Sequence, residues 1–401
     1  MLSSAIILAG ISLAIWIVLT FFRGAFWQLS RFDDDVAPPV PLPSWPRVVA
    51  VLPARNEAET IGRTVESLLT QDYPGEFRIV VVDDHSGDET AALAQRAAEA
   101  RGAASHVTIL QAAPLQPGWT GKLWALQQGV EEAASLSPEY FWFTDADIVH
   151  APDTLRRLVS KAVNHHLDLA SLMVLLQAKT FPERLLIPPF LYFFLKLYPP
   201  RWIADLRART AGAAGGCILL RRSALERIGG ISSIRHEVID DCSLAREVKR
   251  TGGAIWMGLT RKSVSLRAYG TFAEIRDLIA RAAFTQLEYS PLLLLGTIVG
   301  MILTYLVPVA LAFHAQPIVW RMSLAAWALM TITYLPTIRF YRLSPLWAPV
   351  LPVAAAFYSY ATCLSAMRYW LGHGGQWKGR AQAPAKQKDK ARAPAKNHKY
   401  W

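Results

Sequence analysis

The sequence predicts an α/β domain of the Rossmann-like type, with a mostly parallel sheet, between N-terminal and C-terminal transmembrane helices. Strand-like and helix-like segments alternate after position 47, acidic residues follow the strand-like segments, and uncharged apolar runs flank the whole region. Such alternation favours right-handed crossovers that place helices on both faces of a sheet. A chain of 401 residues has room for one such domain and for membrane segments.

The first apolar run, residues 4–22, carries no charge and is long enough for a helix to cross the hydrocarbon core of a bilayer. A cleavable signal peptide is the alternative, but the run has neither a basic start nor a small-residue cleavage site. We therefore expect a transmembrane anchor over 1–23. The prolines of 24–46 favour an extended juxtamembrane linker.

Further apolar runs predict C-terminal membrane segments within 291–371, at about 292–315, 318–336 and 346–370. The third run contains Pro349 and Pro352, so it is either a kinked span or a re-entrant segment. With an external N-terminus, three complete late spans would leave a basic tail outside, against the positive-inside tendency. A re-entrant third run removes that conflict.

The net charge of +11 is concentrated in the tail, 372–401. Between Lys378 and Lys399 there are eight Lys or Arg against one Asp, a net charge of +7. This Ala/Pro/Lys-rich segment has too little apolar content to fold, and we expect it to be disordered against an anionic membrane surface. The charge therefore predicts a membrane partner and no nucleic acid. The three cysteines form neither a disulfide pattern nor a metal-binding pattern.

Within the predicted domain, 47–290, the strand-like segments 47–52 and 77–82 are each followed by a helix-like segment. The second of them ends in Asp83 and Asp84. Ligands of such sheets bind beyond the carboxyl ends of the strands, where carboxylates can accept hydrogen bonds from a base or a ribose. The same two residues can instead cap the following helix.

An aromatic strand-like segment, Tyr140 to Phe143, leads directly into Asp145 and Asp147. Two carboxylates at i and i+2 beyond a strand suit a hard divalent cation, which prefers oxygen ligands and keeps waters or substrate phosphates in its shell. The expected cofactor is Mg²⁺ or Mn²⁺.

Asp240 and Asp241 begin a short helix-like segment that closes at Gly252. They can serve simply as favourable charges at a helix N-terminus. An aspartate is also able to take a proton from a hydroxyl group, so either one is a candidate general base.

Glycine-bearing segments add further candidates. Lys122 follows Gly121 and can neutralise a diphosphate, and Gly215 and Gly216 allow a ligand to approach the backbone closely. Ordinary turns explain both segments equally well. Residues 185–203 are apolar, aromatic and rich in proline, which indicates either an interfacial helix lying on the bilayer or a buried core helix.

The order and spacing of these segments resemble the family 2 glycosyltransferases with the GT-A fold, over roughly 47–290. The matching stretches are Pro53 to Glu57, Val82-Asp83-Asp84, Gly121-Lys122, Asp145-Ala146-Asp147, Gly215-Gly216 with Arg221-Arg222, and Asp240-Asp241. This resemblance implies an inverting transfer of a hexose or pentose from a nucleotide-sugar donor, expected to be a UDP-sugar.

The resemblance also implies a role for each matching residue. The donor would be bound by Ala54, Arg55, Glu57, Asp83, Asp84, Lys122 and Asp145, the metal by Asp147 and Asp145, and the acceptor by Gly215, Gly216 and Arg281, with Asp241 or Asp240 as the base. Many relatives carry a Q/RxxRW motif, of which only Arg281 is present here. The acceptor arrangement therefore cannot be copied from them.

Anchor placement and the late spans are similar to those of the ceramide-glucosyltransferase-like branch. The segments 281–290 and 375–380 are similar to the glycosyltransferases associated with hopanoid synthesis. The resemblance implies one sugar transfer per membrane lipid acceptor, by a multi-pass protein of the bacterial inner membrane whose catalytic domain faces the cytoplasm. The alternatives are a processive polysaccharide synthase and a non-catalytic membrane scaffold that binds nucleotide or lipid.

Overall fold

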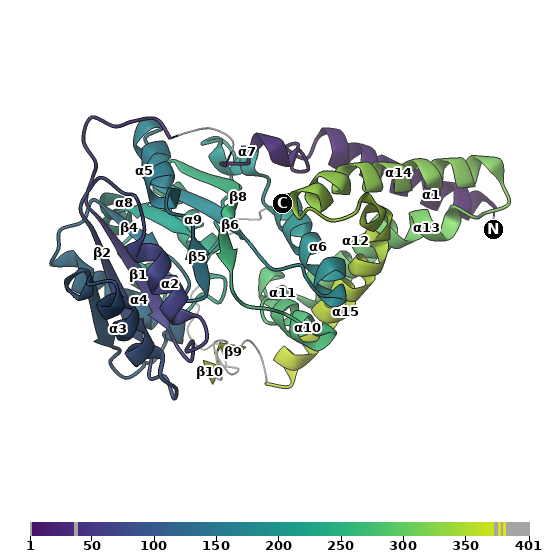
Figure 1. The fold of residues 1–401 in the computed structure, drawn as a ribbon. Coiled ribbons are helices and arrows are strands. Elements are labelled where there is room, and N and C mark those ends of the chain that lie inside the picture. Colours follow the sequence, from purple (N-terminus) through teal and green to yellow (C-terminus); the bar gives the residue numbers. More distant parts are fainter. Residues whose placement is uncertain (1, 36–38, 373–375, 378–379, 382–401) are drawn as a thin grey trace.

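The computed structural model describes residues 2–35, 39–372, 376–377 and 380–381, and shows an α/β domain beside a bundle of apolar helices (Figure 1). An eight-stranded sheet crosses the domain in the order β3-β2-β1-β4-β7-β6-β8-β5. Its strands are β1 (Val48–Ala54), β2 (Phe77–Asp83), β3 (Val107–Gln111), β4 (Tyr140–Phe143), β5 (Ile148–His150), β6 (Leu169–Leu175), β7 (Ile218–Arg221) and β8 (Ile255–Ser265).

The helices of the domain are α2 (Ile61–Leu69), α3 (Thr90–Ala100), η2 (Ala104–His106), α4 (Gly121–Ala134), α5 (Thr154–Asn164), α6 (Phe181–Leu197), α7 (Pro200–Ala204), α8 (Arg222–Arg227), η3 (Ile231–Ile234), α9 (Asp240–Arg250), α10 (Phe272–Ala280) and α11 (Ala283–Gln286). The apolar bundle contains α1 (Leu2–Phe21), α12 (Pro291–Met301), η4 (Ile302–Leu306), α13 (Val307–Leu311), α14 (Pro317–Phe340), η5 (Pro345–Val350) and α15 (Leu351–Trp370). A 3-10 turn, η1 (Leu29–Arg31), follows α1, and β9 (Gln376–Trp377) pairs with β10 (Arg380–Ala381).

The sheet confirms the predicted Rossmann-like, mostly parallel arrangement. Strands β3, β2, β1 and β4 pair in parallel, as do β6 and β8. Only β7, between β4 and β6, and β5, at the edge on β8, run antiparallel to their neighbours. The carboxyl ends of β1, β2 and β4 therefore meet at one edge of the sheet, which is where ligands of such sheets bind.

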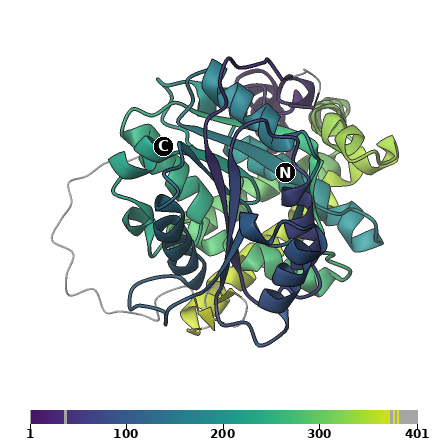
Figure 2. The same cartoon turned by 60° about the vertical axis from the view of Figure 1, so that its left-hand side comes forward.

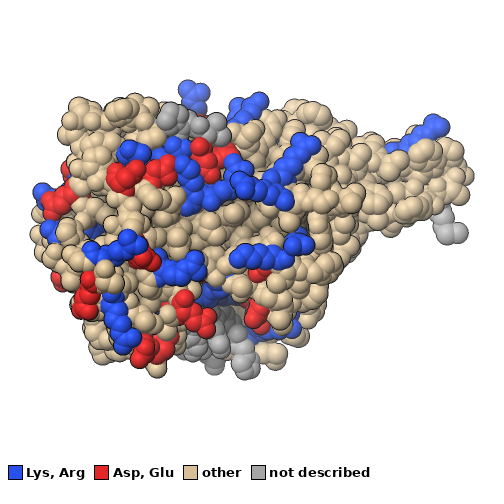
Figure 3. Space-filling model, in the orientation of Figure 1, with Lys and Arg blue, Asp and Glu red and all other residues tan. Residues whose placement is uncertain are grey.

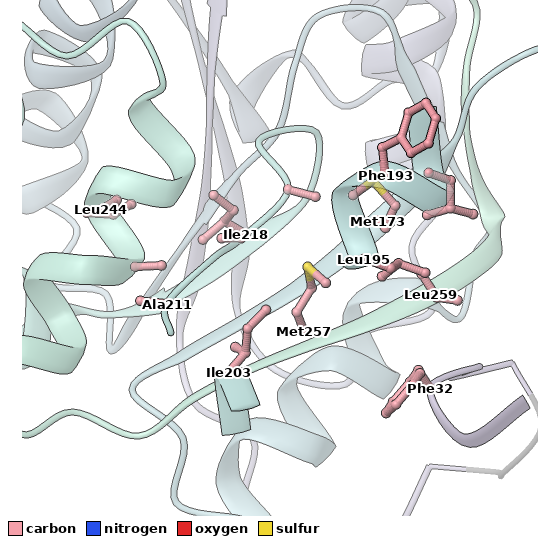
Figure 4. Close-up of a cluster of buried hydrophobic side chains, with 14 of the residues drawn as sticks. Phe32, Met173, Phe193, Leu195, Ile203, Ala211, Ile218, Leu244, Met257 and Leu259 are labelled. Carbon is pink, nitrogen blue, oxygen red and sulfur yellow. The ribbon is translucent and has the colours of Figure 1, made fainter. Parts of the chain in front are cut away.

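Helices cover both faces of the sheet (Figure 2). Side chains alternate along a strand, so Val49 and Val51 of β1 join the core that contains α4, whereas Ala50 and Leu52 join the core that contains α2 and α3. Figure 4 shows part of the first core, where Phe193 and Leu195 of α6 lie near Met173 of β6. This continuous core joins the sheet to the apolar bundle.

The segment after α1 packs on the domain as far as position 35, in contrast to the extended linker expected over 24–46. Phe26 is fully buried, with its ring 5.2 Å from that of Tyr192. Asp33 pairs with Arg261 of β8 at 2.8 Å, and Asp34 pairs with Lys161 of α5 at 3.0 Å. These ion pairs hold the segment that follows α1 against the domain. Positions 36–38 lie outside the described residues.

Helix α6 contains most of the segment 185–203, for which the sequence allowed either an interfacial helix or a buried core helix. Successive positions along it contact η5, α15, α14, η4 and the turn after α1: Phe181 with Trp347, Leu186 with Tyr358, Tyr192 with Thr333, Lys196 with Tyr305 and Leu197 with Arg23. The helix thus crosses the whole apolar bundle at the edge of the domain. Its buried middle matches the core-helix alternative, and an interfacial position stays a prediction.

Four helical segments of the described chain are long and apolar enough to cross a membrane: Ser3–Phe21, Pro291–Leu311, Pro317–Phe340 and Pro345–Trp370. The part of the bundle farthest from the domain shows almost no charged side chains on the face in Figure 3, whereas charged residues gather over the α/β domain. The predicted N-terminal and C-terminal membrane helices are therefore present as candidates.

The last of these segments begins and ends on the domain side of the bundle. At the end of α14, the Phe340 ring lies 5.3 Å from the Arg261 guanidinium of β8. The chain then turns back alongside α14, since the Trp327 indole donates to the Pro349 carbonyl at 3.1 Å. Trp327 lies about 20 Å from Phe340 along α14, at 1.5 Å per residue. Helix α15 returns to α10, where Arg368 pairs with Asp277 at 2.8 Å. This path favours the re-entrant alternative.

We therefore expect the two ends of the chain on opposite sides of the membrane. A single crossing by α1 separates the N-terminus from the domain, α12 with α13 crosses away from the domain side, α14 crosses back, and a re-entrant α15 leaves the C-terminus on the domain side. Fusing a green fluorescent protein or an alkaline phosphatase after Trp401 measures this directly. Fluorescence without phosphatase activity is expected, and an active external phosphatase would show that α15 crosses completely. Most of the predicted tail, from 373 onward, lies outside the described residues.

Candidate functional site

A cleft opens beyond the carboxyl ends of β1 and β4, with about 830 Å³ of space including its open mouth. Glu57, Lys122, Asp145, Asp147, Arg267 and Arg281 are among the residues that line it. A smaller adjoining pocket shares Lys122 and Asp145 with the cleft and adds Gly215 and Asp241. Two of the three acidic clusters that the sequence singled out, Asp145 with Asp147 and Asp240 with Asp241, line this space, whereas Asp83 and Asp84 lie outside both linings.

Lys122 is the central cation of the site, in the first turn of α4. Its ammonium lies 2.9 Å from an Asp145 carboxylate oxygen and 3.0 Å from one of Asp240. Burial acts to lower the pKa of Lys122, but these two carboxylates outweigh it and raise the pKa above its usual value. Lys122 therefore stays charged, and it links two acidic segments that are about 95 residues apart in the sequence.

Asp145 and Asp147 follow β4 in the loop before β5. Burial and the neighbouring Asp145 raise the pKa of Asp147. Burial also acts to raise the pKa of Asp145, but Lys122 overcomes it and lowers that pKa. The two residues thus differ in their partners: Asp145 has Lys122, whereas an Asp147 oxygen accepts a hydrogen bond from Ser265 at 3.2 Å and lies 3.4 Å from Arg267.

Asp240 and Asp241 occupy the N-terminus of α9, as the sequence predicted, but their surroundings differ. Asp240 pairs with Lys122. Asp241 instead accepts hydrogen bonds from two backbone amides, one on each carboxylate oxygen: from Gly215 at 2.9 Å and from Cys242 at 2.7 Å. Burial and the charge of Asp240 raise the pKa of Asp241 to about 6, against the opposing effect of Lys122. A carboxylate with a raised pKa is the better proton acceptor, which favours Asp241 over Asp240 as a base.

A pKa of about 6 for Asp241 predicts a pH dependence. A base must be deprotonated, so transfer should fall as the pH drops through about 6 and be constant above it. The measurement is kcat/KM for the acceptor between pH 5 and 8, because this parameter reports the free enzyme. A profile that stays flat down to pH 5 would contradict the assignment.

Gly215 and Gly216 come together with the acidic residues but serve different purposes. A Cβ atom on Gly215 would lie 3.4 Å from an Asp241 oxygen and 3.5 Å from the Lys122 ammonium, so this residue borders the charged centre. A Cβ atom on Gly216 would lie 3.0 Å from Val174, which makes its lack of a side chain a packing requirement. Gly215 is therefore the one beside the pocket.

The residues expected to hold a nucleoside gather where β1 and β2 end. The Asp84 amide donates to the Ala54 carbonyl at 2.8 Å, and the Arg55 guanidinium lies 3.8 Å from an Asp84 oxygen. Asp83 accepts a hydrogen bond from the Ser86 amide at 3.4 Å, as expected for a residue that caps a turn. Glu57 lines the cleft itself. Whether these residues contact a base or a ribose stays a prediction.

The family model for glycosyl transferase family 2 matches residues 49–229, which run from the second residue of β1 to beyond β7 and include the loop with Asp145 and Asp147. The chain carries a family 2 glycosyltransferase domain. An N-acetylglucosaminyltransferase of Rhizobium leguminosarum bv. viciae is 29% identical over 191 residues, which is 45% of this chain. The match spans only 40% of the length of that curated relative.

Among solved structures, the mannosyltransferase PcManGT of Pyrobaculum calidifontis, in complex with GDP-Man and Mn²⁺, is similar with a TM-score of 0.55 and 19% identity. The similarity covers 90% of this chain and 99% of that one. It confirms the GT-A fold of the glycosyltransferase domain. The finer resemblance to the ceramide-glucosyltransferase-like and hopanoid-associated branch stays a prediction.

Three residues of this site were not singled out from the sequence: Ser265, Arg267 and Tyr269. Arg267 and Tyr269 line the cleft and Ser265 reaches Asp147, because β8 ends beside β5 and so next to the loop that holds Asp147. The available signal was a polar segment directly after a strand-like run, as at the other strand ends. Arg281, which the sequence did single out, lines the cleft at the end of α10.

The residues of the cleft fit a divalent cation in the manner expected for Mg²⁺ or Mn²⁺. In the described part of the chain, no group of three or more His, Cys, Asp or Glu side chains is arranged to hold a metal ion. Asp145 and Asp147 offer carboxylate oxygens, and such ions commonly bind one or two carboxylates together with waters and substrate phosphates. The domain alone would thus supply only part of a coordination shell, and the role of Asp145 and Asp147 as metal ligands stays a prediction.

Proposed function

We propose that this protein transfers a single sugar from a nucleotide-sugar donor to a membrane lipid, with inversion at the anomeric carbon and with a divalent cation. The observation that carries the proposal is the convergence of Asp145, Lys122 and Asp241 on adjoining pockets of a glycosyltransferase domain that is packed against apolar helices. A cation-binding pair, a fixed ammonium and a proton acceptor are the groups that such a transfer requires.

In this mechanism Asp241 takes the proton of the acceptor hydroxyl group. The hydroxyl oxygen bonds to the anomeric carbon of the sugar while the bond between that carbon and the donor diphosphate breaks. The Gly215 and Cys242 amides hold the carboxylate in place throughout. Lys122 stabilises the charge that develops on the leaving diphosphate. A divalent ion held by Asp147 and Asp145 would neutralise the same diphosphate. Asp240 keeps Lys122 in position.

The two relatives support the donor class. One is named an N-acetylglucosaminyltransferase and the other was solved with GDP-Man and Mn²⁺. We extend a nucleotide-sugar donor and a divalent metal to this chain on that basis, with a UDP-sugar as the first donor to test. Glu57, Arg55 and Asp84 would face the nucleoside.

A lipid acceptor follows from the position of the cleft relative to the apolar helices. Arg281 lines the cleft at the end of α10, and the candidate span beginning at Pro291 follows ten residues later. Helix α15 packs on α10 and α11 beside the same entrance. A hydroxyl group at the bilayer surface would therefore lie near Asp241. A hopanoid or a related polyisoprenoid lipid is the acceptor that we propose, in the bacterial inner membrane with the domain facing the cytoplasm.

The test is nucleotide release by the detergent-solubilised protein with UDP- and GDP-sugars, Mg²⁺ or Mn²⁺, and extracted bacterial lipids. Release that requires lipid and stops on chelation is expected. Release that continues equally without lipid, with no glycolipid formed, would contradict the lipid acceptor. Absence of any donor binding would instead favour the scaffold alternative.

A further inference from the structure

Arg267 bridges two carboxylates of the cleft. Its guanidinium donates to Glu57 at 2.7 Å, and its Nε atom lies 3.4 Å from the Oδ2 atom of Asp147. The same Oδ2 atom accepts the hydrogen bond of Ser265. A carboxylate oxygen suited to a metal ion is thus already engaged by a cation and by a hydroxyl group.

The loop that carries Arg267 is firmly held. The Leu266 amide donates to the Asp147 carbonyl at 2.7 Å, and the Gln177 side chain donates to the carbonyls of Ser265 and Leu266 at 3.1 and 2.8 Å. The Arg267 amide donates to the Ser265 hydroxyl at 3.2 Å. The positive charge beside Asp147 is therefore a fixed part of the site and not a surface side chain that swings freely.

Asp145, the other predicted metal ligand, is also paired with a protein cation, because the Lys122 ammonium lies 2.9 Å from its carboxylate. A metal ion entering the cleft without a nucleotide would meet two carboxylates that are each paired with a protein cation. No larger cluster of metal-ligating side chains occurs among the residues that the structure describes. A diphosphate changes this balance, because it brings further oxygen ligands and negative charge.

We propose that Arg267 is a positioning residue that competes with the divalent ion for Asp147 and thereby makes metal binding depend on the donor diphosphate. This inference rests on the proposed function. The coupling is reciprocal: if the diphosphate strengthens metal binding by some factor, the metal strengthens diphosphate binding by the same factor. The enzyme would then take up metal and donor together.

The experiment measures Mn²⁺ affinity of the detergent-solubilised, full-length protein from the electron paramagnetic resonance signal of free Mn²⁺, with and without UDP or GDP. Without nucleotide, Arg267→Gln is expected to bind Mn²⁺ at least about tenfold more tightly than the wild type, because a repelling charge is gone and Asp147 is released. The strengthening of Mn²⁺ binding by the nucleotide should shrink correspondingly.

Matched variants separate charge from hydrogen bonding and from folding. Arg267→Lys keeps a cation and should stay within about threefold of the wild type. Ser265→Ala keeps the Arg267 charge and removes the hydrogen bond to the same Asp147 oxygen, together with the bond that the Ser265 hydroxyl accepts from the Arg267 amide. Arg267→Met repeats the loss of charge with a different side chain in case Arg267→Gln is unstable. Arg276→Gln is the surface control, since Arg276 pairs with Asp277 on α10 outside the cleft lining.

Unchanged or weaker Mn²⁺ binding by folded Arg267→Gln and Arg267→Met would overturn the inference. A loss of nucleotide affinity at constant Mn²⁺ affinity would also overturn it, because Arg267 would then be a donor ligand only. The proposed function fails separately, if the wild type binds neither UDP nor GDP in the presence of Mn²⁺. A wild type that binds nucleotide together with variants that change nothing would refute only the role of Arg267.

Discussion

Asp241→Asn should reduce sugar transfer by about 10²- to 10⁴-fold, the usual contribution of a positioned general base. The amide has nearly the shape of the carboxylate and can still accept one backbone hydrogen bond, but it cannot take the acceptor proton. Donor affinity should change by less than about threefold, because in the proposed mechanism Asp241 contacts the acceptor and not the donor. The measurement is kcat together with the dissociation constant of the nucleotide sugar.

Asp240→Asn is the matched control for this experiment. This variant removes the carboxylate that pairs with Lys122 and leaves the Asp241 carboxylate in place. Donor affinity should therefore change more than it does in Asp241→Asn, and kcat should change less. Wild-type turnover in Asp241→Asn would exclude Asp241 as the base. A loss of the same size in both variants, with equal loss of donor binding, would indicate that the pair acts only through Lys122.

Asp147→Ala should weaken binding of the nucleotide diphosphate at least about tenfold in the presence of Mn²⁺ or Mg²⁺, with little change after chelation. The variant removes a predicted metal ligand and leaves Lys122 to face the diphosphate alone. The measurement is the nucleotide dissociation constant with and without metal, whose ratio should approach one.

Asp72→Ala provides a control of the same chemistry. Asp72 lies outside the cleft lining and pairs with Arg156 at a distance of 2.9 Å. Exposed ion pairs of this kind contribute little to the stability of a fold. This variant should keep the full effect of metal on nucleotide binding. If Asp147→Ala also kept that effect, Asp147 would be a structural partner of Arg267 and not a metal ligand.

Much of the domain was predictable because its signals are local. The apolar, β-branched runs of β1 and β2, the acids at strand ends and the spacing of the helices predict a parallel sheet with a ligand edge, and these patterns arise within stretches of ten residues or fewer. The pairing of β7 and β5 against their neighbours was not predictable, because the direction of a strand depends on where the chain re-enters the sheet.

The difference between Asp240 and Asp241 illustrates the same limit within the site. In sequence they are adjacent acids at a helix N-terminus and look equivalent. In the fold one meets the Lys122 ammonium and the other meets the Gly215 amide, because successive residues of a helix are about 100° apart and therefore face different neighbours. Burial in that position, together with the charge of Asp240, raises the pKa of Asp241 and suits it to accept a proton.

By itself, the sequence determined the fold class, the candidate membrane segments, and most of the charged residues of the cleft, because each depends on hydrophobic periodicity or on residue types that stand close together in the chain. Tertiary structure alone decided that Arg267 reaches both Glu57 and Asp147, that α15 returns to the domain, and that α6 crosses the apolar bundle. These features join segments far apart in the sequence, and which of them meet is set by packing of the whole chain, for which no local pattern is sufficient.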